Sequence, residues 1–216
     1  FKTAGGDPSS SLSFNGLLKE RKKAESGLKN STKINQYIHL LQAWNKTHNL
    51  VSKSQENNLQ EHIEDSLSIF DHTSDTLLDL GSGGGLPGIP IAISGPNKKV
   101  FLIESNSKKS SFLLNATNKM DLKNVTVINS RVEDLGLDQL PIKFEIIARA
   151  VGTVGHVVGL TRTLLDRPGI QLKLMKTELQ LQEEPLPAGY IIKKIYKISS
   201  KEKDKDRILV TIEKDG

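Results

Sequence analysis

The chain has 216 residues, enough for one domain with a sizeable hydrophobic core. It contains no cysteine, which excludes disulfides, thiolate metal sites and cysteine nucleophiles, and no apolar run is long enough to cross a membrane. The 30 basic and 25 acidic residues give a net charge of +5, which favours a polyanionic partner but fits a basic solvated surface equally well.

Residues 1–13 contain adjacent glycines, a proline and a serine run without hydrophobic periodicity, so we expect a flexible end. No apolar signal-peptide core is present, and a cytoplasmic location fits the absence of cysteine. Residues 14–30 form a basic segment that either contacts RNA or is a solvated helix face. From Ser31 the apolar residues follow a helical period, with Ser31 or Thr32 as the N-cap, so we expect N-terminal helices over 31–72.

A second helix in this region carries a possible functional trio, His62, Asp65 and Ser66, which share one face at spacings of three and four. Such a trio could relay protons, but it is more often a hydrogen-bonded structural set, and we favour that interpretation. The helix itself is predicted by an apolar stripe, which consists of Leu59, Ile63, Leu67 and Phe70.

The stretch 77–90 is the most informative part of the chain. An apolar run ends in an acid, alternating glycines follow, and a helix-compatible segment comes next. This order predicts the strand, tight turn and helix start of a nucleotide-binding βαβ unit. Glycines are needed there because the turn is tight and because a side chain would keep the backbone away from a ligand.

Two classes of cofactor compete for these glycines. The dinucleotide fingerprint passes through Gly83, Gly85 and Gly88, whereas the loop pattern for S-adenosylmethionine (SAM) uses Asp79, Gly81, Gly83 and Gly85 and is the fuller match. Asp79 can accept a hydrogen bond from an amino group or from loop amides, but it would repel a pyrophosphate. The residues therefore favour the cationic cofactor, SAM.

Two further acidic positions are expected beside the glycine turn. The apolar run 100–103 predicts a buried parallel strand that ends at Glu104, which is placed to hold the two hydroxyls of a ribose. A strand over 124–128 leads to Val132 and Glu133, where the Glu133 side chain or the backbone of both residues is placed to meet an adenine edge. A plain surface turn at 129–134 is an equal alternative.

Two basic side chains follow predicted strands. A strand over 144–148 leads to Arg149, which needs a carboxylate or phosphate partner in the crevice unless it forms an ion pair that only fastens a loop. A fifth strand over 170–175 delivers Lys176. The other predicted elements are helices over 108–120 and 153–165, and an antiparallel pair, 190–198 and 207–212, joined by a charged hairpin at 199–206.

The motifs from about residue 33 to residue 176 resemble those of the RsmG (GidB) methyltransferases in order and spacing. Two prolines in the Leu-Pro-Gly-Ile-Pro end of the glycine loop are the specific part, because other SAM enzymes and dehydrogenases do not require them there. The matching segments are 45–50 (Asn-Lys-Thr-His-Asn-Leu), 61–66 (Glu-His-Ile-Glu-Asp-Ser), 79–90, 130–133 (Ser-Arg-Val-Glu) and 149–150 (Arg-Ala).

The resemblance implies an α/β fold of the class I SAM-dependent methyltransferase type, Rossmann-like, with an N-terminal helical extension and a SAM-binding domain over 73–216. It implies transfer of a methyl group to N7 of a guanine in 16S rRNA, guanine 527 of the decoding-region 530 loop in rRNA numbering. The partner would be 16S rRNA or the small ribosomal subunit. We expect a monomer that needs neither a membrane nor a metal.

The resemblance and the loop pattern together give the expected site residues. Lys176 matches a lysine that precedes a glycine in the family, although Thr177 follows it here. The expected cofactor contacts are Asp79, Gly81, Gly83, Leu86, Glu104, Val132, Glu133 and Arg149, and the expected substrate contacts are Arg149, Lys176 and His62.

The implied chemistry needs no general base. Guanine N7 carries an in-plane lone pair that is not protonated at neutral pH, so its attack on a methyl group depends on alignment and exclusion of water. We therefore name no catalytic acid or base, and His62 and Asp65 are positioning candidates. Two other functions remain open on the sequence alone, an NAD-dependent oxidoreductase and a non-catalytic RNA-binding module on the same fold.

Overall fold

The computed structural model describes residues 14–198 and 206–216, and the side chains within these ranges except 14–26 and 137. Seven strands form one sheet in the order β3-β2-β1-β4-β5-β7-β6. The first five strands pair in parallel, and β7 pairs antiparallel with both β5 and β6. The strands are β1 (Thr76–Leu80), β2 (Lys99–Ile103), β3 (Val125–Ile128), β4 (Glu145–Arg149), β5 (Gln171–Thr177), β6 (Tyr190–Ile198) and β7 (Arg207–Lys214).

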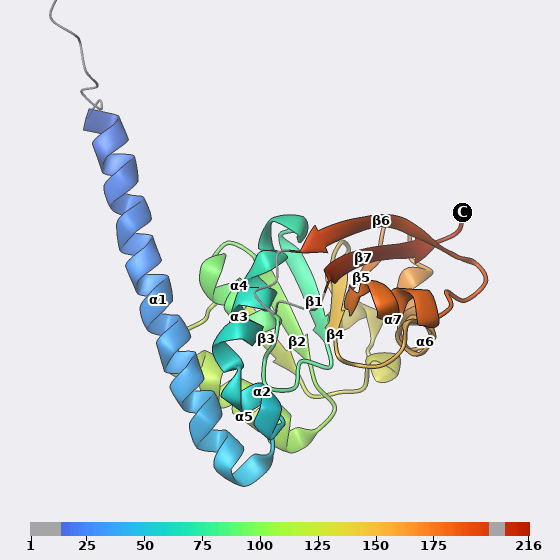
Figure 1. Ribbon diagram of the computed structural model, residues 1–216, viewed down its shortest axis with the longest axis horizontal. Coiled ribbons are helices and arrows are strands. Elements are labelled where there is room, and N and C mark those ends of the chain that lie inside the picture. Colours follow the sequence, from blue (N-terminus) through green and yellow to red (C-terminus); the bar gives the residue numbers. More distant parts are fainter. Residues whose placement is uncertain (1–13, 199–205) are drawn as a thin grey trace, which may run out of the picture.

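Helices cover both faces of the sheet (Figure 1). On one face α1, α3, α4 and α5 pack against side chains such as Leu77 and Leu102, and on the other α6 packs against Leu78 and Ile146. Burial on both faces explains why the parallel strands are almost continuously apolar in sequence. The helices are α1 (Phe14–His48), α2 (Lys53–Asn57), α3 (Leu59–Ser68), α4 (Gly88–Ser94), α5 (Ser107–Lys119), α6 (Val154–Leu165) and α7 (Glu178–Glu183), with one-turn 3₁₀ helices η1 (Phe70–His72), η2 (Val132–Asp134) and η3 (Leu137–Gln139).

The strand order places a topological switch point at β1. The chain passes from β1 to β2 and β3 on one side and then returns to β4 on the other side of β1. In open α/β sheets, ligands bind beyond the carboxyl ends of the strands at such a point. The predicted α/β sheet is confirmed, and the glycine turn that follows β1 lies at its switch point.

The expected helix start at Ser31 is wrong, because α1 is continuous from Phe14 to His48 and its N-terminal part extends beyond the sheet (Figure 1). Thr32 lies within the helix, where its hydroxyl donates to the Leu28 carbonyl at 3.0 Å instead of capping a helix end. The basic segment 14–30 contains no proline and many strong helix formers, so nothing interrupts the helix there. The expected boundary between residues 30 and 31 therefore falls inside α1, whereas the boundary at 72/73 stays a prediction.

Two short helices, α2 and α7, are absent from the sequence-based prediction. Each begins with a capping box, Ser52 with Gln55 and Thr177 with Gln180, in which side chain and backbone exchange hydrogen bonds. Residues 1–13 and most of the charged hairpin lie outside the described residues. Within the described ranges, no helix combines the length and apolar character needed to cross a membrane.

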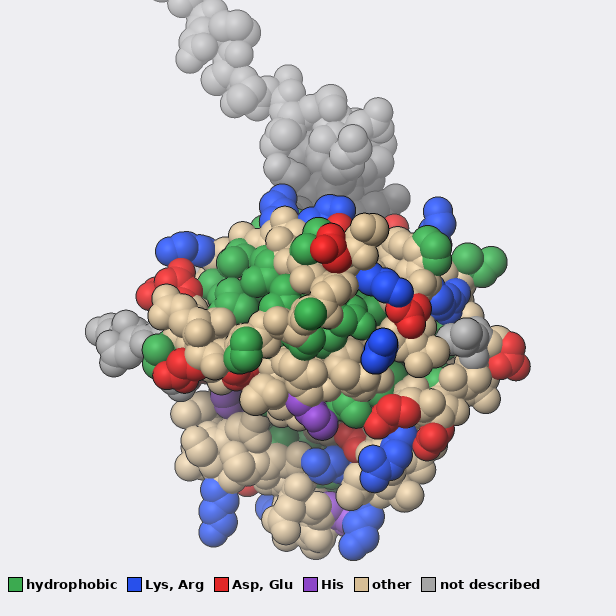
Figure 2. All heavy atoms as spheres, turned by 90° about the vertical axis from the view of Figure 1, so that its right-hand side faces the viewer, with side chains coloured by type: hydrophobic (Ala, Val, Ile, Leu, Met, Phe, Trp, Pro, Cys, Tyr) green, Lys and Arg blue, Asp and Glu red, His purple; other side chains and the backbone are tan. Residues whose placement is uncertain are grey.

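The outer edge of the sheet is formed by β6, which exposes Ile191, Ile192 and Ile195. Figure 2 shows the side of the molecule that carries β6, β7, α6 and α7, where hydrophobic side chains gather between charged ones. Lysines 193, 194 and 197 interrupt the apolar positions along this edge strand, which limits unwanted pairing with another strand.

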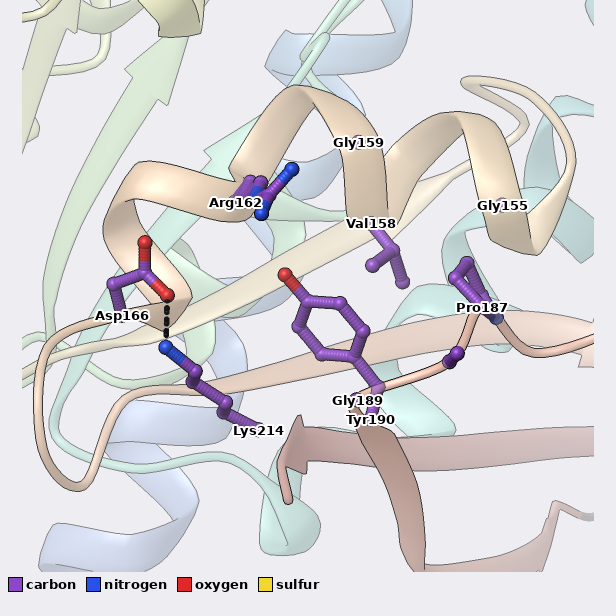
Figure 3. A pocket seen from close by; sticks show the side chains of 10 residues that line it. Gly155, Val158, Gly159, Arg162, Asp166, Pro187, Gly189, Tyr190 and Lys214 are labelled. Atoms are coloured by element: carbon purple, nitrogen blue, oxygen red, sulfur yellow. Dashed lines mark hydrogen bonds and ion pairs between the residues drawn. The ribbon is translucent and has the colours of Figure 1, made fainter. Parts of the chain in front are cut away.

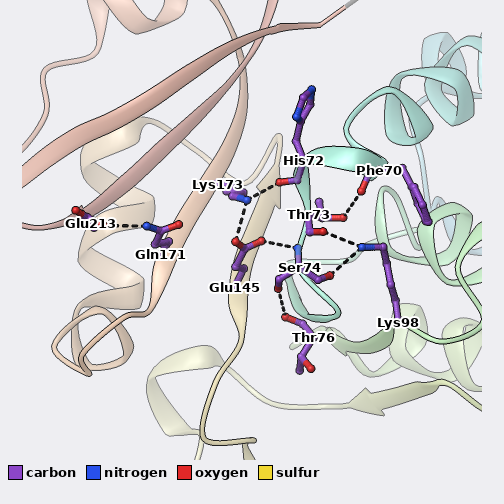
Figure 4. A network of polar contacts seen from close by, with 10 residues as sticks. All are labelled: Phe70, His72, Thr73, Ser74, Thr76, Lys98, Glu145, Gln171, Lys173 and Glu213. Atoms are coloured by element: carbon purple, nitrogen blue, oxygen red, sulfur yellow. Dashed lines mark hydrogen bonds and ion pairs between the residues drawn. The ribbon is translucent and has the colours of Figure 1, made fainter.

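A buried ion pair fastens the segment before β1 to the sheet (Figure 4). Lys173 of β5, only 6% exposed, lies 2.9 Å from the Glu145 carboxylate of β4 and also donates to the His72 carbonyl. The second oxygen of Glu145 accepts from the Ser74 amide at 2.8 Å, and Lys98 donates to the Ser74 carbonyl at 3.0 Å. This network fixes η1, and with it the end of α3, against the middle of the sheet.

We predict that Lys173→Met lowers the free energy of unfolding by about 3 kcal/mol, because Glu145 then keeps a largely buried charge without its counterion. Lys193→Met is the matched control, since the Lys193 side chain is 54% exposed in its pair with Glu213. That change should cost less than about 1 kcal/mol. Urea unfolding measures the free energy of unfolding of both variants. Equal effects of the two substitutions would contradict the conclusion that the buried ion pair of Lys173 and Glu145 stabilises the fold.

Candidate functional site

The turn after β1 uses left-handed backbone at three glycines, with φ of +65° at Gly81, +56° at Gly83 and +95° at Gly85. Residues with a side chain rarely adopt these left-handed backbone angles, which is why glycine recurs here. A Cβ at Gly85 would lie 2.4 Å from Ile89, whereas a Cβ at Gly83 would meet nothing closer than the Gly81 carbonyl oxygen at 3.8 Å. Gly85 therefore allows α4 to pack closely, and Gly83 leaves the outer side of the turn open.

Glu104 joins the glycine turn to the next two strands. Its carboxylate accepts from the Gly83 amide and from the Asn106 amide, each at 2.8 Å, and the residue is 7% exposed. The Asn129 side chain donates to the Glu104 carbonyl at 2.7 Å, which attaches the loop after β3. Each carboxylate oxygen keeps a second lone pair, so Glu104 can still accept hydrogen bonds from ribose hydroxyls.

The loop after β3 runs from Asn129 into η2, where Val132 is buried and Glu133 is exposed. Since β1, β2 and β3 are parallel neighbours, their carboxyl ends meet at one edge of the sheet. The structure thus brings the predicted residues Gly81, Gly83, Glu104, Val132 and Glu133 to that edge. Leu86 lies half-buried within the same turn.

Asp79 supports the turn from beneath. It is fully buried, and one carboxylate oxygen accepts from the Gly88 amide at 3.0 Å while the other has no hydrogen-bond partner among the described residues. Burial raises the pKa of the Asp79 carboxyl to about 7, against an opposing effect of the Gly88 hydrogen bond. The predicted contact with a loop amide is confirmed, and a contact with a cofactor amino group stays a prediction.

Tyr37 is a supporting residue that sequence reasoning missed. Its hydroxyl, carried by α1, donates to the Gly84 carbonyl at 2.6 Å, and burial raises its pKa so that it keeps its proton. A Cβ on Gly84 would lie 3.0 Å from Val51 and 3.1 Å from Leu41, so α1 and the segment after it press against the turn. The only signal for Tyr37 is its place on the apolar stripe of the helix.

Arg149 connects the end of β4 to α3. The guanidinium donates to the His62 carbonyl at 2.9 Å and to the Ser66 hydroxyl at 3.3 Å, and it lies 2.6 Å from His62 Nδ1. The carboxylate of Asp65 is 3.9 Å away, and both charged side chains are 10% exposed. The trio His62, Asp65 and Ser66 thus has the contacts expected of a structural set, and the choice between this role and a proton relay stays a prediction. Contacts of Arg149 and His62 with cofactor or substrate stay predictions.

Lys176 is likewise engaged within the protein. Its ammonium donates to the Gly152 carbonyl and to the Glu184 carboxylate, both at 2.7 Å, and the residue is 7% exposed. Glu184 also accepts from the Val154 amide at 2.7 Å. Desolvation opposes ionisation of Glu184, but the hydrogen bonds from Lys176 and Val154 outweigh it and lower the pKa. Lys176 thus holds the segment after α7 against the start of α6, and its predicted role in substrate binding stays a prediction.

A cavity of about 280 Å³ lies between α6 and the turn that precedes β6 (Figure 3). Gly155 and Gly159 of α6 face Tyr190 across it, and an ion pair of 2.6 Å between Asp166 and Lys214 borders it. No predicted site residue lines this cavity. Among the described residues, no cluster of three or more histidine, aspartate or glutamate side chains is placed to hold a metal ion.

Comparison with known proteins decides the family. The family model for GidB, described as rRNA small subunit methyltransferase G, matches residues 30–209. The chain belongs to the GidB family. The resemblance carried by the sequence motifs is thereby confirmed, and the family is one of SAM-dependent methyltransferases.

Two relatives illustrate how the GidB assignment is supported. A protein from Hydrogenovibrio crunogenus named Ribosomal RNA small subunit methyltransferase G is 36% identical over 185 residues, 85% of each chain. A protein of the same name from Coxiella burnetii is 41% identical over 143 residues, 65% of this chain and 68% of its own. The alternative of an NAD-dependent oxidoreductase finds no support in these matches.

A solved structure supports the fold of this GidB-family chain. The SAM-dependent methyltransferase from Aquifex aeolicus superposes with a TM-score of 0.52 at 18% identity, covering 78% of this chain and 97% of that one. The class I methyltransferase fold is thereby confirmed. The site also fits SAM on its own geometry, because Gly83 leaves the turn open and Glu104 can accept from a ribose beside it.

We predict that Gly83→Asn lowers the affinity for SAM more than tenfold, because the new side chain occupies the open side of the turn. Asparagine tolerates left-handed backbone, so the free energy of unfolding should change by less than about 1 kcal/mol. In Gly88→Ala, by contrast, the Cβ would lie 2.4 Å from Leu102 and 2.6 Å from Asp79 inside the core, which should cost about 2 kcal/mol of stability. Calorimetry with SAM and urea unfolding separate the two effects, and unchanged SAM affinity in Gly83→Asn would refute the loop assignment.

The raised pKa of Asp79 predicts a pH dependence of stability. Because the folded pKa is about 7 and the ordinary value is 3.8, the native state binds a proton more tightly than the unfolded state, and this group's contribution to stability falls as pH rises between those values. Without SAM, wild type should therefore lose about 3 kcal/mol relative to Asp79→Asn between pH 5 and pH 8. Chemical unfolding across this range tests it, and parallel pH profiles of the two proteins would contradict it.

Proposed function

We propose that the chain transfers the methyl group of SAM to N7 of a guanine in 16S rRNA of the small ribosomal subunit. The target would be guanine 527 of the decoding-region 530 loop, in rRNA numbering. The observation that carries the proposal is the hydrogen bond from the Gly83 amide to the Glu104 carboxylate. It fixes the glycine turn, with its open side facing outward, at the switch point of a GidB-family sheet. The named function of the curated relatives supports the rRNA substrate.

In this proposal the protein binds and aligns its reactants. Glu104 accepts hydrogen bonds from the ribose hydroxyls, the backbone at Gly81 and Gly83 allows close approach, and the exposed Glu133, or the backbone of Val132 and Glu133, meets the adenine edge. SAM supplies, when bound, a methyl group made electrophilic by the adjacent sulfonium. Alignment of a nucleophile with such a group supplies most of the acceleration that this reaction needs.

Chemistry at guanine N7 requires no dedicated base. The nitrogen attacks through a lone pair that carries no proton at neutral pH, so no side chain has to remove one. Two titratable candidates already have structural contacts, since Asp79 holds the Gly88 amide and His62 contacts Arg149. These residues therefore act in the proposal as supports of the turn and of α3.

The proposal predicts that replacing the target guanine by 7-deazaguanine abolishes methyl transfer, because a C–H group then stands where N7 was. The measurement is incorporation of label from methyl-labelled SAM into small subunits, or into 16S rRNA, that carry either base. An unmodified guanine in the same preparation serves as the control. Label in the 7-deaza substrate would show that another atom is methylated. SAM binding without transfer to either substrate would favour the non-catalytic RNA-binding module.

A further inference from the structure

A second cavity, of about 500 Å³, opens beside the glycine turn. It lies between the end of α1, the segment 49–56 and the first turn of α5, and three lysines from three helices line it, Lys46, Lys53 and Lys109. We call it the lysine cavity. Glu56 is the one acidic residue in its lining, against three lysines.

The lysine cavity contacts the predicted cofactor site on two sides. Val51, which lines the cavity, lies 3.0 Å from the position of a Cβ on Gly84. On the other side, the Lys109 amide donates to the Asn106 side chain at 3.1 Å, and the Asn106 amide donates to Glu104. A ligand in the cavity would therefore lie next to the turn that is proposed to hold SAM.

The wall of the lysine cavity is fixed from within. Asn45, 8% exposed, donates to the Glu56 carboxylate at 2.8 Å and accepts from the Val51 amide at 2.9 Å. The capping box of Ser52 and Gln55 fixes the start of α2, from which Lys53 extends. The acid in the lining is thus engaged in holding the segment 49–56.

The three lysines are available to a ligand. Lys46 and Lys53 are exposed and Lys109 is half-buried, and none of the three forms a side-chain hydrogen bond or an ion pair with any part of the chain between residues 27 and 198 or after 205 that the structure describes. Phosphate groups are the natural partners of such a cluster, because lysine binds phosphate as a point charge and the binding releases counterions.

Another cavity of similar size provides a comparison. It measures about 490 Å³ and is lined by Lys29, Lys33 and Lys123, but it lies near the amino end of β3, at the opposite edge of the sheet from the glycine turn. Two of its three lysines are engaged with Asp121, which pairs with Lys123 at 2.6 Å and accepts from Lys33 through its carbonyl at 3.5 Å. Both cavities are therefore lined by three lysines. The lysine cavity differs in lying beside the glycine turn and in having lysines that form no hydrogen bond or ion pair with the described residues.

We propose that the lysine cavity binds backbone phosphates of the RNA strand that carries the target base. The inference rests on the proposed function and adds to it the surface that positions the RNA. Phosphate contacts fix the register and orientation of a nucleic acid without reading its sequence. Contacts at Lys46, Lys53 and Lys109 would hold the strand while the neighbouring base is presented to the glycine turn.

The test compares two triple variants that remove the same charge, K46Q/K53Q/K109Q and the control K29Q/K33Q/K123Q. The probe is a fluorescent RNA hairpin that contains the decoding-region loop, and binding is followed by anisotropy between 50 and 200 mM KCl. The lysine-cavity variant should lose at least about tenfold in affinity at 100 mM KCl, and its salt slope should fall by about 2, since each phosphate contact with a single strand contributes about 0.7. The control variant should lose less than about threefold.

SAM affinity, measured by calorimetry, should stay within about twofold of wild type in both triple variants, which shows that both remain folded. Equal losses of RNA affinity in the two variants would refute the inference, because only net charge would then matter. Unchanged RNA binding in the lysine-cavity variant, with wild-type methyl transfer intact, would refute the inference and leave the proposed function standing. Selective loss of RNA binding without any transfer by wild type would support the cavity as an RNA site while the proposed function fails.

Discussion

The hydrogen bond from the Gly83 amide to the Glu104 carboxylate is the contact on which the geometry of the site depends. It ties the turn after β1 to the end of β2, and the bond from Asn129 to the Glu104 carbonyl adds the loop after β3. A charged acceptor forms stronger hydrogen bonds to amides than a neutral one, and here it is almost enclosed. One carboxylate therefore sets the relative positions of three loops, and each of its oxygens keeps a lone pair for a further hydrogen bond.

The N-terminal helices support this arrangement and are more than an extension attached to a finished domain. Tyr37 of α1 donates to the Gly84 carbonyl, and Arg149 at the end of β4 is enclosed by residues of α3. The network around Lys173 and Glu145 fixes the chain between α3 and β1. Removal of these helices would leave the glycine turn without its support and Arg149 without its partners, so the site belongs to the helices and the sheet together.

The sequence was sufficient to predict the five parallel strands within one or two residues, because strands buried on both faces read as short apolar runs bounded by polar residues. It also located Glu104 and the glycine turn, because the number of residues between them is set by the length of one βα unit. The partners of Arg149 and Lys176 could not be predicted, since they depend on which helix lies over the end of a strand. The start of α1 was missed because a charged helical stretch has no apolar period, whereas the capping boxes at Ser52 and Thr177 were readable signals for α2 and α7.

The position of β7 has a consequence for how the sheet is assembled during synthesis. Although β7 follows β6 in the sequence, it lies between β5 and β6 and is the one strand that pairs with β6 in the described parts of the chain. A nascent chain that has not yet emerged beyond residue 206 therefore has a parallel sheet whose β5 edge is open and a hydrophobic segment, 190–198, with nothing to pair with. Open edges and unpaired strands invite association with other chains. The interval between emergence of β6 and emergence of β7 is thus a stage at which the chain presents both an open sheet edge and an unpaired strand, the two features that favour aggregation.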